Sequence, residues 1–286
     1  MRVLITGGAG LVGGELARLA PPGVDAEITV HTSPATVAGL KSHRIDLTQS
    51  MAFLELIERR RPDLVIHTAY SKTDHRATID SATEVAVACG AAEIALIHFS
   101  TDAVFDGDHP PYDEAAQPSP VHGYGRAKSI AETAVREACP DAAIIRTSLV
   151  LAADGSDSTS AWAIESMRRG EGVTFFDDEF RCPIFVDDLA HQTWEIAALG
   201  AAERAGVWHL VGPDRLSRAD VGRCLVERFE LDAVLMHTAS ADTMGEPRPR
   251  DLSLSSQRVG SLHVQARPIG SVGDHGTTSE QPTRPA

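Results

Sequence analysis

The sequence has few aromatic residues (5%), only four cysteines and no long apolar run. Cys89, Cys139, Cys182 and Cys224 form no CxxC pair and show no zinc-type spacing to histidine, so we expect reduced thiols and no metal site. No apolar stretch reaches the length of a membrane span. Basic residues are also scarce: 26 Lys and Arg stand against 40 Asp and Glu, a net charge of -14. This balance argues against a nucleic acid or a membrane as partner, and we expect a cytoplasmic protein.

Short apolar runs alternate with helix-length segments through the first half of the chain. The runs are nearly continuous, as in strands that are buried on both faces of a sheet. This alternation predicts the α/β class, with a doubly wound parallel sheet covered by helices on both faces. The expected strands are Arg2–Thr6, Ala26–His31, Leu64–Thr68, Ile94–Ser100, Ala143–Leu149 and Val207–Val211. The expected helices include one that ends before Pro62, one capped by Asp187 or Asp188 that runs to about Leu199, and one capped by Ser217 that runs through Glu230.

A glycine-rich segment, Thr6-Gly7-Gly8-Ala9-Gly10-Leu11-Val12-Gly13, stands between the first strand and the first helix. Gly7, Gly10 and Gly13 allow a tight turn, close approach of a pyrophosphate and close packing of the helix on the strand. The start of the helix then directs backbone N–H groups at the phosphates. In this strand–turn–helix context the segment, with Leu11 and Val12, predicts a dinucleotide site; the alternative is a structural turn.

The chain is expected to divide into three parts. We predict that residues 1–150 form a NAD(P)-binding domain of the Rossmann type. Residues 151–272 are expected to form a smaller substrate-binding lobe, of which some segments return to the main sheet. Residues 273–286 are rich in Gly, Ser, Thr, Gln and Pro without periodicity, which predicts a disordered tail.

The choice of cofactor is expected to depend on His31, Thr32 and Ser33, about twenty residues past the glycine loop. A carboxylate there would accept from the adenosine 2′-OH and repel a 2′-phosphate. Hydroxyls and an imidazole tolerate a phosphate, so the sequence favours NADP(H) over NAD(H), unless an acid lies elsewhere in the site. Asp46 and Leu47 are placed to meet the adenine; alternatively, Asp46 only caps the helix that follows.

The segment Tyr124-Gly125-Arg126-Ala127-Lys128 places a phenol and an ammonium one helical turn apart. With three tyrosines and three lysines in the chain, this spacing arises by chance with a frequency of ~0.03. The ammonium can lower the pKa of the phenol and bond a ribose hydroxyl, so that the phenol protonates a ketone oxygen as hydride arrives. The alternative is a surface tyrosine beside a solvated lysine.

A third catalytic group is expected at the carboxyl end of a parallel strand, where ligands bind in open α/β sheets. Ser100 and Thr101 end the apolar run that begins at Ile94. Thr101 is the candidate that orients the substrate carbonyl. Ser100 competes with it, because the alternation of side chains along a strand does not decide which of the two faces the cleft.

The segments TGGAGLVG, STDAVFDG and YGRAK together resemble the extended short-chain dehydrogenase/reductase family, in its dTDP-4-dehydrorhamnose reductase-like branch, over roughly residues 1 to 260. The resemblance implies that Tyr124 is the general acid, Lys128 its partner and Thr101 the orienting hydroxyl. It also implies that Ala69 and Tyr70 lie on the nicotinamide side, and Thr68 before them is expected to bind the cofactor. The implied activity is NADPH-dependent reduction of a nucleotide-linked 4-keto-6-deoxy sugar.

The substrate half departs from the pattern of this branch. Ala103 stands where the branch usually has tyrosine, and Leu149 where it usually has tryptophan, so stacking area is lost. We expect Ala103, Val104 and Leu149 to face the substrate. Arg181, with Arg248 or Arg250, is expected to neutralise a substrate pyrophosphate.

Three other functions are alternatives to the reductase. A 4,6-dehydratase is disfavoured, because it typically has glutamate where this chain has Ala103. A sugar-nucleotide 4-epimerase stays open, since it uses the same tyrosine and lysine. A non-catalytic NADP-binding regulatory subunit would fit the altered substrate half, although the retained Tyr124 and Lys128 argue against it. Whether the chain forms a homodimer is left open.

Overall fold

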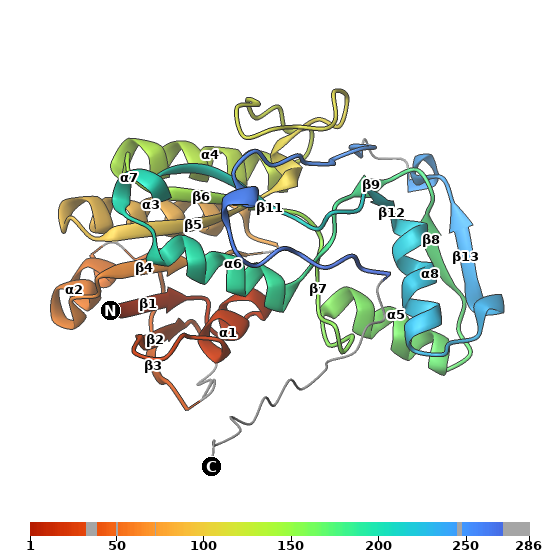
Figure 1. Cartoon of the computed structure of the whole chain (residues 1–286), viewed down its shortest axis with the longest axis horizontal. Helices are drawn as coiled ribbons and strands as arrows, with labels where there is room; N and C mark the ends of the chain where they lie inside the picture. The colour runs from red at the N-terminus through yellow and green to blue at the C-terminus, as the bar shows by residue number, and fades with distance from the viewer. Residues whose placement is uncertain (33–38, 50, 72, 245–247, 271–286) are drawn as a thin grey trace, which may run out of the picture.

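The computed structural model is built on a seven-stranded parallel sheet (Figure 1). It describes residues 1–32, 39–49, 51–71, 73–244 and 248–270. The strand order is β11-β6-β5-β4-β1-β2-β3, so the chain starts in the middle and winds outward in both directions. This order confirms the doubly wound parallel sheet that the sequence predicts. The strands are β1 (Arg2–Thr6), β2 (Asp25–Val30), β3 (Lys41–Arg44), β4 (Leu64–His67), β5 (Ala95–Thr101), β6 (Ala143–Thr147) and β11 (Gly206–Leu210).

Helices cover both faces of the sheet, because alternate side chains of each buried strand point to opposite faces. Val3 and Ile5 of β1 belong to a core cluster shared with α1 and α6. Leu4, between them, belongs to the opposite cluster, shared with α2, α3 and α4. Both faces of the central strand are therefore buried. The helices are α1 (Leu11–Arg18), α2 (Ala52–Arg60), α3 (His75–Ala91), α4 (Gly123–Ala138), α6 (Val186–Ala198) and the short α7 (Ala201–Arg204).

A smaller lobe lies beside the carboxyl ends of the main strands, at the right of Figure 1. Its core joins α5 and α8 to the parallel pair β8 and β13. The strand β11, which follows α6 and α7 in the chain, pairs with β6 in the main sheet. The remaining elements are α5 (Ser158–Arg168), α8 (Arg218–Arg228), β7 (Val150–Leu151), β8 (Val173–Phe176), β9 (Phe180–Arg181), β10 (Ile184–Phe185), β12 (Leu216–Ser217), β13 (Met236–Ala239), η1 (Asp102–Val104), η2 (Ala233–Leu235), η3 (Ala241–Met244) and η4 (Val259–Ser261).

The predicted helix caps have different outcomes. Ser217 caps α8 with a capping box, in which its hydroxyl accepts from the Asp220 backbone N–H. The cap predicted for α6 is wrong: Phe185 is the N-cap. Asp187 and Asp188 lie in the first turn of α6 instead, and their carboxylates bind the Arg267 side chain.

Residues 248–270, here called the closing segment, run back across both lobes. Leu252 and Leu254 pack against Phe105 beneath the carboxyl end of β5. Ile269 packs with Phe185, and the Arg267 guanidinium donates to the acidic pair at the start of α6. The closing segment therefore joins the smaller lobe to the main sheet. The tail predicted at residues 273–286 lies outside the described residues.

The described residues also limit what the chain can bind. Among the helices of the described residues, none is long and apolar enough to cross a membrane. The same residues contain no group of three or more His, Cys, Asp or Glu side chains placed to hold a metal ion. All four cysteines are free thiols, and three of them are buried.

Candidate active site

Two cavities adjoin at the carboxyl ends of β1, β4 and β5. The first has a volume of about 460 Å³ and the second of about 820 Å³. Gly7, Gly10, Thr68 and Tyr70 line both, so the two cavities meet at the glycine loop. A ligand that crosses this loop would therefore have one end in each cavity.

The glycine loop has the backbone that a pyrophosphate requires. Gly7 has a φ of +71°, and a Cβ there would lie 2.9 Å from the Ala69 backbone. A Cβ on Gly13 would lie 2.4 Å from the Gly7 carbonyl oxygen. Gly10 is the N-cap of α1, with no side-chain cap, so the positive end of the helix dipole opens to the cavities. These residues fit a dinucleotide. Leu11 and Val12 line the second cavity beside them.

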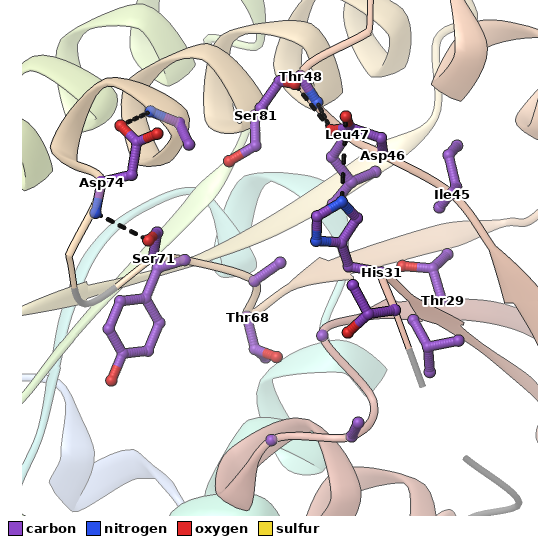
Figure 2. Close-up of a pocket in the computed structure, with 18 residues that line it drawn as sticks. Thr29, His31, Ile45, Asp46, Leu47, Thr48, Thr68, Ser71, Asp74 and Ser81 are labelled. Atoms are coloured by element: carbon purple, nitrogen blue, oxygen red, sulfur yellow. Dashed lines mark hydrogen bonds and ion pairs between the residues drawn. The ribbon is translucent and has the colours of Figure 1, made fainter. Parts of the chain in front are cut away.

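The far end of the first cavity contains the residues predicted to choose the cofactor (Figure 2). His31, Thr32, Asp46 and Leu47 line it, while Ser33 lies outside the described residues. The His31 Nε2 lies 4.0 Å from an Asp46 carboxylate oxygen.

Asp46 is held in place by the turn that it caps. Its carboxylate accepts from the Thr48 hydroxyl at 2.7 Å and from the Thr48 backbone N–H at 3.0 Å. These hydrogen bonds lower the pKa of Asp46. Asp46 does not cap α2, whose N-cap is Met51.

Arg44 is a residue that the sequence reasoning missed at this end. Its Nε donates to the His31 carbonyl oxygen at 3.3 Å, which brings a guanidinium to the end of β2. Arg44 belongs to β3, an edge strand of four polar residues whose pattern carries no apolar signal.

Tyr124 lies in the first turn of α4 and lines the second cavity together with Thr101 and Lys128. Burial raises the pKa of the Tyr124 phenol; Tyr70 and Asp102 raise it further, and a hydrogen bond with Thr101 opposes them. The pKa is therefore raised rather than brought toward neutrality, because burial is the largest influence on the phenol; a stabilising effect of Lys128 on the phenolate stays a prediction. The phenol is therefore held in its protonated form.

Lys128 is buried one turn further along α4. Its Nζ donates to the Phe99 carbonyl oxygen at 2.5 Å. Burial lowers the pKa of Lys128 to about 8, and the Glu132 carboxylate opposes this shift. Lys128 therefore changes charge within the range of pH in which enzymes are assayed.

Glu132 anchors a buried charge cluster beneath the cavity. It accepts from the Ser100 hydroxyl at 2.5 Å and from two nitrogens of Arg146 at 3.0 and 2.9 Å. Although burial by itself would raise the pKa of Glu132, these donors, chiefly Arg146, hold it below its ordinary value. The cluster fixes α4 against β5 and β6.

The sequence does not decide whether Ser100 or Thr101 orients the substrate, and the structure gives the two hydroxyls different partners. Ser100 and Thr101 both reach the second cavity, but the Ser100 hydroxyl donates to buried Glu132. The Thr101 hydroxyl donates to an Asp102 carboxylate oxygen at 3.2 Å, accepts from the Ala103 backbone N–H at 3.2 Å and also has a hydrogen bond with Tyr124. This arrangement favours Thr101 as the orienting hydroxyl, and its catalytic role stays a prediction.

Three of the four predicted substrate residues line the second cavity: Ala103, Leu149 and Arg181. Val104 does not, which corrects the prediction for this residue. It is fully buried, because the turn η1 directs its side chain into the core with Phe105 and Leu252.

Three arginines contribute to the wall of the second cavity. Arg181 Nε lies 3.6 Å from an Asp102 carboxylate oxygen. Arg248 also lines this cavity, whereas Arg250 lines a separate one and pairs with Asp178. The sequence reasoning missed Arg218. This residue directly follows the Ser217 cap, and it also lines the second cavity.

Comparison with known proteins gives a match over most of the chain. The family model described as RmlD substrate binding domain matches residues 1–268. The probable low-salt glycan biosynthesis reductase Agl14 of Haloferax volcanii is 30% identical over 276 residues, which cover 91% of this chain and 91% of that protein. The dTDP-4-dehydrorhamnose reductase of Mycolicibacterium smegmatis is 32% identical over 277 residues, which cover 90% of this chain and 79% of that protein.

Solved structures share the fold. A dTDP-4-dehydrorhamnose reductase from Bacillus anthracis in complex with NADP has a TM-score of 0.77 at 22% identity, covering 93% of this chain and 95% of that one. The Bordetella bronchiseptica enzyme WbmH in complex with NAD+ has a TM-score of 0.80 at 18% identity, covering 94% of each chain. At these identities the likeness shows the fold alone.

Proposed function

This chain belongs to the family of the RmlD substrate binding domain, and on that premise we propose that it is an NAD(P)-dependent reductase of a nucleotide-linked 4-keto-6-deoxy sugar. One observation carries the proposal. Tyr124, Thr101 and Lys128 line a single cavity that meets the glycine loop. The names of the relatives support the substrate class, since several are reductases of dTDP-linked keto sugars.

The chemistry follows from the state of the three side chains. When it is bound in the two adjoining cavities, a reduced nicotinamide cofactor supplies the hydride. Tyr124, whose pKa is raised, holds the proton that the ketone oxygen needs when it becomes an alcohol. The Thr101 hydroxyl orients the ketone toward the phenol. Lys128, when charged, stabilises the phenolate that is left after the proton has moved.

The substrate diphosphate is assigned to the arginine side of the second cavity. Arg181, Arg218 and Arg248 line this wall. Guanidinium groups bind phosphate oxygens in a bidentate manner, so this wall suits the diphosphate of a sugar nucleotide. Ala103 and Leu149 lie in the same cavity and present only small or aliphatic surface to the sugar.

We assign NADP(H) as the preferred cofactor. Thr32 and His31 line the end of the first cavity without a carboxylate of their own, and Arg44 lies against His31. The Asp46 carboxylate is nearby but accepts hydrogen bonds from Thr48. An arginine at this place accommodates the 2′-phosphate of NADP.

The variant Thr32→Asp tests the cofactor assignment, with Thr32→Asn as its neutral isosteric control. A carboxylate a few ångströms from the 2′-phosphate repels it, so the affinity for NADPH is expected to fall at least about tenfold. The affinity for NADH should change less than about threefold. Equal losses for both cofactors, or for both variants, would contradict the assignment.

The variant Tyr124→Phe tests the reductase itself. NADPH oxidation is followed with dTDP-linked 4-keto-6-deoxy sugars, and loss of the proton donor should lower kcat by about 100-fold or more. NADPH affinity should stay within about threefold, because the ring is kept. Wild-type protein that binds NADPH but turns over none of these sugars would refute the proposed function. A 4-epimerase would instead interconvert epimers without net oxidation of added NADPH. A cytoplasmic location and a homodimer stay predictions.

A further inference from the structure

His122 is a lining residue of the second cavity to which the reductase chemistry above gives no role. It is the N-cap of α4, two residues before Tyr124. Its Nδ1 accepts from the Gly125 backbone N–H at 3.0 Å. The ring centroids of His122 and Tyr124 are 6.3 Å apart, and the ring planes differ by 20°. The imidazole is therefore fixed beside the phenol.

The cap hydrogen bond determines the tautomer of His122. A ring nitrogen that accepts an N–H carries no proton, so the neutral imidazole has its proton on Nε2. Burial lowers the pKa of His122, a hydrogen bond with its own backbone opposes this shift, and the charges of Arg181, Arg126 and Arg248 lower the pKa further. The ring is therefore neutral at ordinary pH, with Nε2 as a donor.

The position of this donor follows from the shape of the ring. Nδ1 and Nε2 face different directions, so an imidazole whose Nδ1 meets the first turn of α4 directs Nε2 away from that turn. His122 lines the same cavity as Arg181 and Arg248, and both charges act on the ring. With Nδ1 occupied by the cap, Nε2–H is the ring donor that remains for a ligand in the second cavity, which His122 lines.

A 4-keto-6-deoxy sugar offers this donor one acceptor next to the reacting carbon. The keto carbon has two neighbours: one bears a hydroxyl, and the other leads to the methyl group. Ala103 and Leu149 present apolar surface in this cavity, which suits the methyl. We propose that the Nε2–H of His122 binds the hydroxyl on the carbon adjacent to the ketone, and so selects substrates that retain this hydroxyl.

This inference rests on the proposed function and deepens it. A site built to bond a hydroxyl rejects an analogue that lacks it, because the donor of the site is then left unpaired. For the half-buried His122, we expect about a tenfold preference for the hydroxylated substrate. The cap role of the same ring must be separated from this contact by experiment.

The variant His122→Ser separates the two roles. Serine is a strong N-cap residue and still accepts from the Gly125 N–H, but it is too short to place a donor in the cavity. The variant His122→Asn is the second member of the pair, since it caps the helix and retains a shorter N–H donor. Each protein is assayed with NADPH and two substrates: dTDP-4-dehydrorhamnose and its 3-deoxy analogue.

The expected result is a pattern across proteins and substrates. His122→Ser should lose about tenfold in kcat/KM with the 3-hydroxy substrate and lose nothing with the 3-deoxy analogue. His122→Asn should recover part of that loss. NADPH affinity and Tm should be unchanged in both variants. Equal losses with both substrates would show a purely structural cap, and no loss with either would show no contact; each result overturns the inference.

A binding experiment keeps this test independent of turnover. The NADP+-loaded protein is titrated with dTDP-rhamnose and with 3-deoxy-dTDP-rhamnose in a calorimeter. If no keto sugar is reduced, the proposed function fails, and the calorimetry alone decides the role of His122. About tenfold weaker binding in His122→Ser, confined to the 3-hydroxy ligand, supports it. Any other pattern, including no binding at all, overturns it.

Discussion

Raising the pH through the pKa of Lys128 is expected to remove activity while the fold becomes more stable. The pKa of this buried ammonium is lowered to about 8, chiefly by burial. Above that pH the amine is neutral and no longer stabilises the phenolate of Tyr124. Beyond the pKa, kcat/KM should therefore fall about tenfold per pH unit, because the charged fraction falls by that factor.

The effect on stability has the opposite sign. The unfolded chain has the ordinary lysine pKa of 10.5, so between about pH 8 and that value it binds more protons at Lys128 than the folded chain does. The free energy of unfolding therefore rises with pH across this window. The difference between the two pKa values corresponds to about 3 kcal/mol. Below about pH 8 the full cost of burying the charge is present.

The assay compares wild type with Lys128→Arg and Lys128→Met. The rate of NADPH oxidation is measured against pH, and unfolding by urea is measured over the same range. Lys128→Arg stays charged, so it should be slower overall but lack the alkaline limb. Lys128→Met should lack the rise in stability. If the alkaline limb persists in Lys128→Arg, or if the wild-type rate stays flat two units above the pKa, then Lys128 is not the titrating group.

Two further predictions concern the frame of the site. Gly13→Ala adds a Cβ that would lie 2.4 Å from a backbone oxygen of the glycine loop, so NADPH affinity should fall at least about tenfold in a fluorescence titration. Gly260→Ala is the control, because its Cβ meets nothing within 4 Å; equal effects would refute the close packing. Glu132→Leu should lower the free energy of unfolding by about 3–5 kcal/mol, because it leaves buried Arg146 uncompensated. The double variant Glu132→Leu/Arg146→Met should recover part of this loss in urea unfolding, and strictly additive losses would contradict a direct pair.

The parts of the fold that follow from short-range patterns could be predicted from the sequence. The apolar runs of β1 and β4 and the glycine loop are local, and each indicates its own structure without help from distant residues. The α4 pair is also local, since one helical turn joins Tyr124 to Lys128. The strand β3 could not be predicted in this way. Its four residues are polar, and they form a strand because they pair with β2.

The parts of the site that depend on tertiary contacts could not be predicted from the sequence. Val104 was expected at the cavity wall, but a tight turn directs it into the core. The raised pKa of Tyr124 could not be predicted either, since burial of the phenol depends on residues far along the chain. For Arg218, the sequence indicated only that a helix begins there, and not that the side chain lines the cavity. Such positions are determined by how distant segments meet, which no local pattern contains.

The closing segment has a consequence for how the protein is made. Synthesis proceeds from the N-terminus, so the glycine loop and Tyr124 leave the ribosome well before Arg248. Leu252 and Leu254, which lie under the turn after β5, emerge later still. A nascent chain can thus form its glycine loop early in translation. The second cavity is complete only when the closing segment docks.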